Sequence, residues 1–166
     1  MIVVVMGVSG SGKTTIGRLL AARLGCEFID GDDFHPPANV AKMAAGTPLG
    51  DAERWPWLEI LNEKLRTRTA AVLACSALKE AYRSVLARDL ADCRIVHLRG
   101  DIELIRARLE SRRHRYMPAS LLESQFQTLE PPANAIDVDI SLPPEECVAG
   151  IIHRLGAAGA GGRGGR

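Results

Sequence analysis

The chain has 166 residues, 46% of them apolar, and its 21 Lys and Arg residues nearly balance its 20 Asp and Glu residues. This length suffices for one well-buried core and is too short for two ordinary domains. The formal net charge of +1 argues against a nucleic-acid or membrane partner, so any phosphate chemistry must be local. The four cysteines stand far apart without a C-x-x-C pair, as is typical of reduced thiols in a cytoplasmic protein.

Short apolar runs recur along the chain and predict strands. The first, residues 2–6, is a continuous, largely β-branched run, as in a strand buried on both faces of a parallel sheet. Similar runs follow at residues 26–29, 71–75, 94–98 and 136–140. Between them, apolar residues recur at the three- and four-residue spacing of amphipathic helices. This alternation predicts an α/β fold, with a five-stranded parallel sheet covered by helices on both faces.

Two insertions and a tail interrupt the alternation. Residues 36–69 contain turns rich in Pro, Gly and Trp together with a helix, and residues 112–120 are basic. Excursions from the carboxyl ends of strands are where open α/β sheets bind ligands, so both insertions are expected near a binding site. Residues 156–166, rich in Gly and Arg, predict a disordered tail after a single domain of residues 1–155.

The stretch GVSGSGKT, residues 7–14, lies between the first predicted strand and the first predicted helix and fits G-x-x-x-x-G-K-[ST]. Its glycines let the backbone turn inward, so that N–H groups face phosphate oxygens at the positive end of the helix. Lys13 is expected to reach the β- and γ-phosphates, and the Thr14 hydroxyl to bind Mg²⁺. The residues expected to contact the nucleotide here are Gly7, Val8, Ser9, Gly10, Ser11, Gly12, Lys13, Thr14 and Thr15.

The rest of the chain narrows the class of nucleotide-binding protein. A switch GTPase would need an N-K-x-D motif and a D-x-x-G motif, and neither occurs in the sequence. The chain is also too small for a helicase or another large ATP-driven motor. A small-molecule kinase is therefore the leading class.

The stretch DGDDFHP, residues 30–36, concentrates negative charge directly after the second predicted strand. Asp30 and Asp32 stand two apart, hence on the same side if the chain stays extended there. One of them can hold Mg²⁺ or its water while the other accepts the proton of the attacking hydroxyl. Asp30 is the predicted metal residue and both are predicted catalytic residues, while the choice of base among Asp30, Asp32 and Asp33 stays open. Asp33 would point away, toward His35 or substrate hydroxyls. A solvated acidic turn is the structural alternative.

Four stretches carry a resemblance to a known family: GVSGSGKTT, DGDDFHPPANVAKMAAGTPLGDAERWPWL, CSALKEAYR and SQFQTLEPP. Together they resemble gluconate kinase (gluconokinase), of the shikimate-kinase-like group of P-loop kinases, over about residues 1–155. The resemblance implies the P-loop kinase fold and the ATP-dependent phosphorylation of D-gluconate at its 6-hydroxyl, giving 6-phospho-D-gluconate, with Mg²⁺ as cofactor. It also implies a homodimer.

D-Gluconate is a polyol with a carboxylate, so it needs hydrogen-bonding groups for its hydroxyls and cations for its acid end. Arg54, Lys79 and Arg83 are the predicted cations, although a stack on an indole for Arg54 and a surface face for the other two are structural alternatives. Ser76, at a strand end, can bond substrate or a Mg²⁺-linked water. The residues expected at the substrate are Asp32, Asp33, His35, Arg54, Ser76, Lys79 and Arg83.

The second insertion, residues 112–120, is expected to be the lid of such a kinase. Arg108 and Arg112 stand four apart on the helix leading into it, so one can face the phosphates while the other braces the lid, unless both belong to a solvated basic face. The chain reads Arg115-Tyr116-Met117 where gluconate kinases commonly have His-Phe-Met, and Glu53 where they have Asp before an arginine. The first departure puts in doubt a lid role for a histidine at position 115.

Two alternatives stay open beside gluconate phosphorylation. One is a related small-molecule kinase acting on shikimate, another sugar acid or a nucleotide. The other is a non-catalytic ATP-binding module, against which stand the intact Lys13, Thr14, Asp30 and Asp32.

Overall fold

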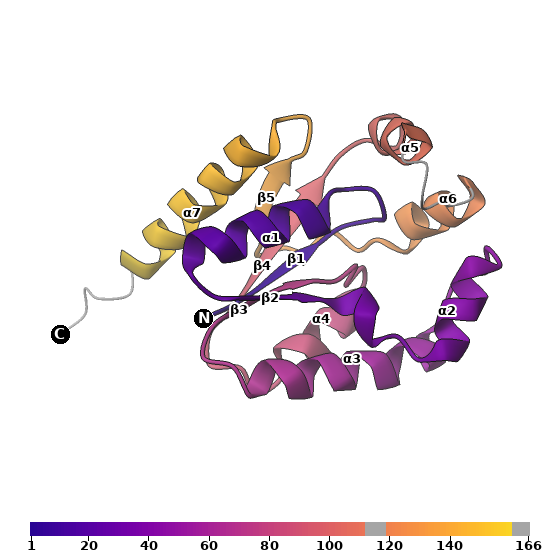
Figure 1. Ribbon diagram of the computed structural model, residues 1–166, viewed down its shortest axis with the longest axis horizontal. Coiled ribbons are helices and arrows are strands. Elements are labelled where there is room, and N and C mark those ends of the chain that lie inside the picture. The colour runs from indigo at the N-terminus through magenta and orange to yellow at the C-terminus, as the bar shows by residue number, and fades with distance from the viewer. Residues whose placement is uncertain (112–118, 161–166) are drawn as a thin grey trace.

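The computed structural model describes residues 1–111 and 119–160. In this part of the chain five parallel strands form one sheet, in the order β2-β3-β1-β4-β5, with helices on both faces (Figure 1). The predicted α/β class and five-stranded parallel sheet are thus confirmed. The strands are β1 (Ile2–Met6), β2 (Glu27–Asp30), β3 (Ala71–Ala74), β4 (Cys93–Arg99) and β5 (Ile136–Asp139). The helices are α1 (Lys13–Leu24), the 3-10 helix η1 (Gly31–Phe34), α2 (Pro37–Ala44), α3 (Asp51–Arg66), α4 (Glu80–Ala87), α5 (Ile102–Ser111), α6 (Ala119–Thr128) and α7 (Pro144–Ala160).

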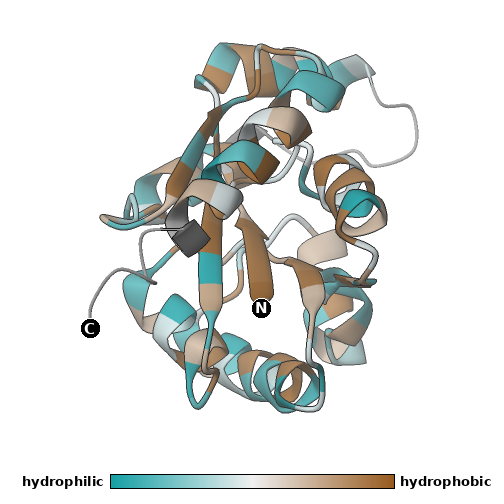
Figure 2. Ribbon diagram, turned by 90° about the vertical axis from the view of Figure 1, so that its left-hand side faces the viewer, coloured by the Kyte–Doolittle hydropathy of each residue, from teal (hydrophilic) through white to brown (hydrophobic). Residues whose placement is uncertain are grey.

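Strand β1 is buried on both faces, and its alternating side chains feed two apolar layers. Val3 and Val5 pack on the side of α1 and α7, while Val4 and Met6 pack on the side of α3 and α4. Figure 2 shows the hydrophobic strands lying between helices of mixed hydropathy. This double burial explains why β1 reads as an uninterrupted apolar run. Because all five strands are parallel, their carboxyl ends lie at one edge of the sheet, together with the loops that follow them.

The last helix extends beyond the predicted end of the domain. Helix α7 continues to Ala160, so residues 156–160 are helical and the boundary drawn after residue 155 is wrong. Three of these five residues are alanine, the best helix former, which lets the helix run on past its last buried turn. Residues 161–166 lie outside the described part of the chain.

Two further properties follow from the described residues. All four cysteines are free, in agreement with the prediction of reduced thiols. Within residues 1–111 and 119–160, no helix is both long enough and apolar enough to span a bilayer.

Arg83 acts as an internal brace. Its side chain lies in α4 and is only 3% exposed. The guanidinium donates to the carbonyl oxygens of Ala77 (2.9 Å), Leu78 (3.1 Å) and Glu130 (3.0 Å), and to the Glu80 carboxylate through two nitrogens (2.8 and 3.1 Å). These contacts use all five N–H groups of an arginine. The geometry therefore argues against the predicted contact of Arg83 with a substrate carboxylate.

The substitution Arg83→Met tests the brace. It keeps most of the side-chain volume but leaves the carbonyl of the buried Ala77, and that of Glu130, without this donor, so the free energy of unfolding should fall by about 2–4 kcal/mol. Urea denaturation measures the loss. Arg66→Met is the matched control, because Arg66 is exposed and only 3.9 Å from a single acidic partner, Asp89. Unchanged stability of Arg83→Met, together with a raised KM for the acceptor substrate, would restore the predicted substrate role.

Candidate active site

The loop between β1 and α1 forms a cradle at the positive end of α1. Gly7 and Gly12 have φ angles of 154° and 96°, and a Cβ on Gly7 would lie 2.7 Å from the Ser11 hydroxyl oxygen. The N–H groups of the first helical turn have no partners within a helix and attract anions. The Lys13 ammonium donates to the Val8 carbonyl (3.0 Å), so its side chain folds back along the loop. The predicted phosphate-binding stretch thus has the conformation that its chemistry requires.

The acidic stretch after β2 does not stay extended, so Asp30 and Asp32 do not lie on one side of a strand as predicted. The chain turns at once into η1, and the Asp30 carboxylate accepts a hydrogen bond from the Asp32 backbone N–H (3.1 Å). An Asp at this position caps the turn by satisfying an otherwise unpaired N–H group. Asp30 and Asp32 nevertheless line the same cavity, whereas Asp33 is exposed and does not line it.

The cradle and the acidic turn meet at Thr14 and Asp30. The Thr14 hydroxyl donates to the second Asp30 carboxylate oxygen over 3.1 Å. Gly31 permits the approach, since a Cβ there would lie 2.8 Å from the Ala74 carbonyl oxygen at the end of β3. A hydroxyl beside a carboxylate provides hard oxygen ligands of the kind that Mg²⁺ prefers. The predicted metal residues are therefore brought together.

A cavity of about 650 Å³ opens beside this junction. Its walls come from the cradle, the acidic turn, α2, α5 and α6, which Figure 1 places around the tip of the β1–α1 loop. Its polar lining includes Ser9, Lys13, Thr14, Thr15, Asp30, Asp32, His35 and Gln125, and its apolar lining includes Val40, Met43, Ala44, Leu109 and Leu121. Nucleotide-binding and acceptor-binding residues predicted from separate motifs thus share one space.

His35 faces this cavity from a fixed position. Its ring stacks on Trp57, with centroids 4.0 Å apart, and its Nδ1 lies 3.5 Å from the Asn39 amide nitrogen. An amide nitrogen only donates, which favours the tautomer with its proton on Nε2, 3.8 Å from an Asp32 carboxylate oxygen. Burial lowers the pKa of His35 below its usual value. His35 is therefore neutral at pH 7 and offers one N–H donor beside Asp32.

The predicted carboxylate-binding cations Arg54 and Lys79 do not line this cavity but cluster around Tyr82. The Arg54 guanidinium carbon and the Lys79 ammonium nitrogen are 5.5 and 5.6 Å from the centre of the Tyr82 ring. Lys79 also pairs with Asp51 (3.0 Å), while Arg54 donates to the Leu49 carbonyl (3.2 Å). A hydrogen bond from the Tyr82 hydroxyl, then one from Lys79, lowers the pKa of Asp51. The structural alternative for Arg54 is a stack on an indole, whereas the contact found is with the phenol ring of Tyr82.

Ser76 and Arg108 touch the cradle region from two other sides. The Ser76 carbonyl accepts from the Gly7 N–H (3.4 Å), so the loop after β3 contacts the cradle through its backbone. Arg108 bonds the Ile140 carbonyl and lines a second cavity, of about 250 Å³, together with Thr15 and Leu142. Arg112 and most of the predicted lid, residues 112–118, lie outside the described residues.

Several residues at the site had no predicted role. Gln125 lines the main cavity and contacts the cradle, although its motif SQFQTLEPP served only for the family resemblance. Tyr82 and Asp51 organise the two cations, and α2 contributes an apolar wall. These roles could not be predicted from the sequence, because each depends on a contact between segments that are far apart along the chain.

Comparisons with known proteins identify the family. A family model described as shikimate kinase matches residues 9–130. A gluconokinase of Gluconobacter oxydans is 50% identical over 135 residues, covering 79% of this chain and 76% of that protein. A probable gluconokinase of Xenopus tropicalis is 48% identical over 163 residues, covering 84% of this chain and 86% of that protein. The crystal structure of a gluconokinase from Sinorhizobium meliloti superposes with a TM-score of 0.88 at 39% identity, with 97% of each chain covered.

These matches span most of the chain, and the family model covers the acidic turn and the cradle from Ser9 onward. The chain belongs to the gluconokinase family, within the shikimate-kinase-like group of P-loop kinases.

Proposed function

We propose that this chain transfers the γ-phosphoryl group of ATP to the 6-hydroxyl of D-gluconate, giving 6-phospho-D-gluconate and ADP. The observation that carries the proposal is the single cavity shared by the cradle and the acidic turn, in a chain of the gluconokinase family. Phosphoryl transfer needs the nucleotide and the attacking hydroxyl in line, and catalysis consists mainly of positioning and charge stabilisation.

Lys13, Thr14 and Asp30 form the nucleotide side of the proposed site. Lys13 moves from the Val8 carbonyl to the β- and γ-phosphates when ATP binds. Among residues 1–111 and 119–160, no group of three or more His, Cys, Asp and Glu side chains could hold a metal ion. Mg²⁺ fits this setting, because it commonly uses one or two protein ligands and completes its shell with phosphates and water. Thr14 and Asp30 would hold it, and it would neutralise charge on the phosphates.

Asp32 is the proposed general base. It is exposed, it lines the cavity beside Asp30, and its carboxylate has the neutral His35 as a neighbour. A carboxylate there can accept the proton of the 6-hydroxyl as the hydroxyl attacks. His35 donates from Nε2 to a substrate hydroxyl, and Asp33, outside the cavity lining, is left for a peripheral hydroxyl.

The carboxylate end of D-gluconate is assigned to Arg54 and Lys79. Arg54 lies near the start of α3, where its charge acts on the cavity-lining His35, and Lys79 lies at the start of α4, but Lys79 is already paired with Asp51. A substrate carboxylate must therefore compete with Asp51 for Lys79, which makes Arg54 the stronger candidate. Arg83 is left out, because its donors are used inside the protein.

Three further parts of the proposal concern the nucleotide and the assembly. Arg108 and Leu142 line the second cavity beside the start of α1, which makes it the proposed adenine site, with the guanidinium stacked on the base. Residues 112–120 are the proposed lid, with Arg112 reaching the transferring phosphoryl group. A cytoplasmic homodimer without nucleic-acid or membrane partners completes the proposal.

Acceptor choice separates the proposed function from its nearest alternative. With ATP and Mg²⁺ present, D-gluconate should support steady ADP release in a coupled assay, while shikimate at the same millimolar concentration should not. The reason is that Asp32 and His35 offer hydrogen-bonding groups for a polyol in the cavity of a chain of the gluconokinase family. Turnover of shikimate without turnover of D-gluconate would contradict the proposal, and ADP release without any acceptor would indicate an ATPase.

Removing the proposed base gives a second test. Asp32→Asn keeps the size of the side chain but cannot take a proton, so kcat should fall by about 10²–10⁴-fold while binding of an ATP analogue is preserved. Asp92→Asn is the control, because Asp92 lies at the amino end of β4, on the opposite edge of the sheet, and pairs with Arg94. An unchanged kcat for Asp32→Asn would move the base role to Asp30 or Asp33.

A further inference from the structure

Gln125, in α6, forms two hydrogen bonds with the cradle, which lies more than a hundred residues earlier in the sequence. The Ser9 backbone N–H donates to the Gln125 side-chain oxygen over 2.7 Å, and the Gln125 side-chain nitrogen donates to the Ser9 hydroxyl over 3.0 Å, across a separation of 116 residues. The Gln125 amide thus contacts one residue through both its oxygen and its nitrogen. Paired hydrogen bonds of this kind fix orientation as well as distance.

The neighbouring glycine is also held from outside the loop. A Cβ on Gly10 would lie 2.8 Å from Leu109 and 3.2 Å from Ile105, so the tip of the loop packs against α5. Helix α6 is anchored independently of Gln125, since Leu122 is only 1% exposed in the core on the α1 side. The glycines allow the backbone conformation of the loop, and contacts with α5 and α6 stabilise that conformation.

The peptide group that Gln125 holds also binds Lys13. The Ser9 N–H and the Val8 carbonyl belong to one planar peptide unit, whose N–H and C=O point in opposite directions. Gln125 accepts from the N–H end, while the Lys13 ammonium donates to the carbonyl end over 3.0 Å. The Ser11 N–H also donates to that carbonyl, over 3.2 Å. A rotation of this peptide would therefore displace the acceptor that holds Lys13.

We propose that Gln125 is a positioning residue for Lys13, acting through the Val8–Ser9 peptide group. The inference rests on the proposed function, in which Lys13 acts on the β- and γ-phosphates. Gln125 fixes the plane of the Val8–Ser9 peptide, and the Val8 carbonyl then fixes the position of the Lys13 ammonium before ATP binds. Gln125 itself touches no reacting atom in this arrangement.

The variant Gln125→Met tests the inference, because it keeps the length of the side chain and removes both hydrogen bonds. Small misplacements of a catalytic group are costly, so kcat should fall about tenfold or more, with the KM for D-gluconate nearly unchanged. Gln127→Met is the matched control: the same change on the same helix, at an exposed position outside the cavity lining, with activity like that of the wild type. Gln125→Ala should behave like Gln125→Met, and melting temperatures establish that each variant is folded.

A binding measurement isolates the action through Lys13. Calorimetry with ADP and with a non-hydrolysable ATP analogue is performed on wild type, Gln125→Met, Lys13→Met and the double variant. Gln125→Met should weaken the analogue more than ADP, and it should add little in the Lys13→Met background. Additive effects, equal losses for ADP and the analogue, or a raised KM for D-gluconate at full kcat would overturn the inference. This arm needs no acceptor, so it still decides the role of Gln125 if D-gluconate is not phosphorylated.

Discussion

The hydrogen bond between the Thr14 hydroxyl and the Asp30 carboxylate, 3.1 Å long, is the contact on which the site depends. Strand β3 lies between β1 and β2, so the loops that follow β1 and β2 must meet across the end of a third strand. They can do so because Gly31 leaves room for the Ala74 carbonyl, which a side chain would strike. Without that approach the cradle would bind a nucleotide with no acceptor beside it. The nucleotide chemistry and the acceptor chemistry are thus joined by backbone packing at the sheet edge.

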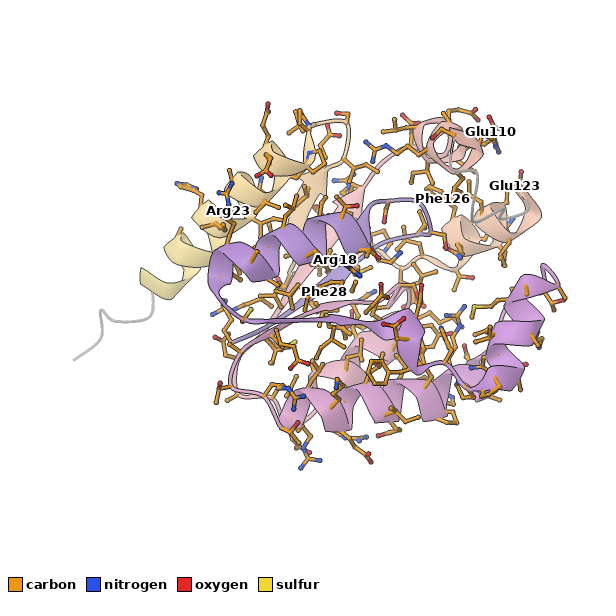
Figure 3. The ribbon with its side chains drawn as sticks, viewed as in Figure 1. Arg18, Arg23, Phe28, Glu110, Glu123 and Phe126 are labelled. Carbon is orange, nitrogen blue, oxygen red and sulfur yellow. The ribbon has the colours of Figure 1, made fainter. Side chains whose placement is uncertain are left out.

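The remaining walls of the site are set by helices that touch the cradle. Gln125 of α6 and Leu109 of α5 contact adjacent residues of the loop, while Val40 and Met43 of α2 line the cavity with it. Figure 3 draws the described side chains of α5 and α6 and labels Glu110, Glu123 and Phe126 among them. The apolar side chains of α2, α5 and α6 suit phosphoryl transfer, because excluding water from the site suppresses hydrolysis of ATP. Burial raises the pKa of the nearby Cys75 thiol to about 12, which keeps it protonated at neutral pH.

The parts of the molecule that depend on local sequence could be predicted. Short stretches of sequence identify the strand Ile2–Met6, the cradle and the acidic turn. Burial on both faces and phosphate binding by N–H groups each require particular side chains at fixed spacing. The parts that depend on distant contacts could not. Nothing near Arg83 reveals that the Glu130 carbonyl will take one of its donors, and nothing near Gln125 reveals Ser9 as its partner. The prediction that Asp30 and Asp32 share one side depends on an extended chain. The chain instead turns into a 3-10 helix, which the hydrogen bond from the Asp32 N–H to the Asp30 carboxylate caps.

The most direct test of the central claim is the effect of Mg²⁺ on nucleotide affinity, measured by calorimetry with a non-hydrolysable ATP analogue on wild type and Asp30→Asn. If Thr14 and Asp30 hold the metal against the phosphates, Mg²⁺ should strengthen binding to the wild type. The variant should then lose about tenfold or more of that gain, because a charged ligand becomes neutral. An equal gain from Mg²⁺ in both proteins would show that the junction of the cradle and the acidic turn does not hold the metal.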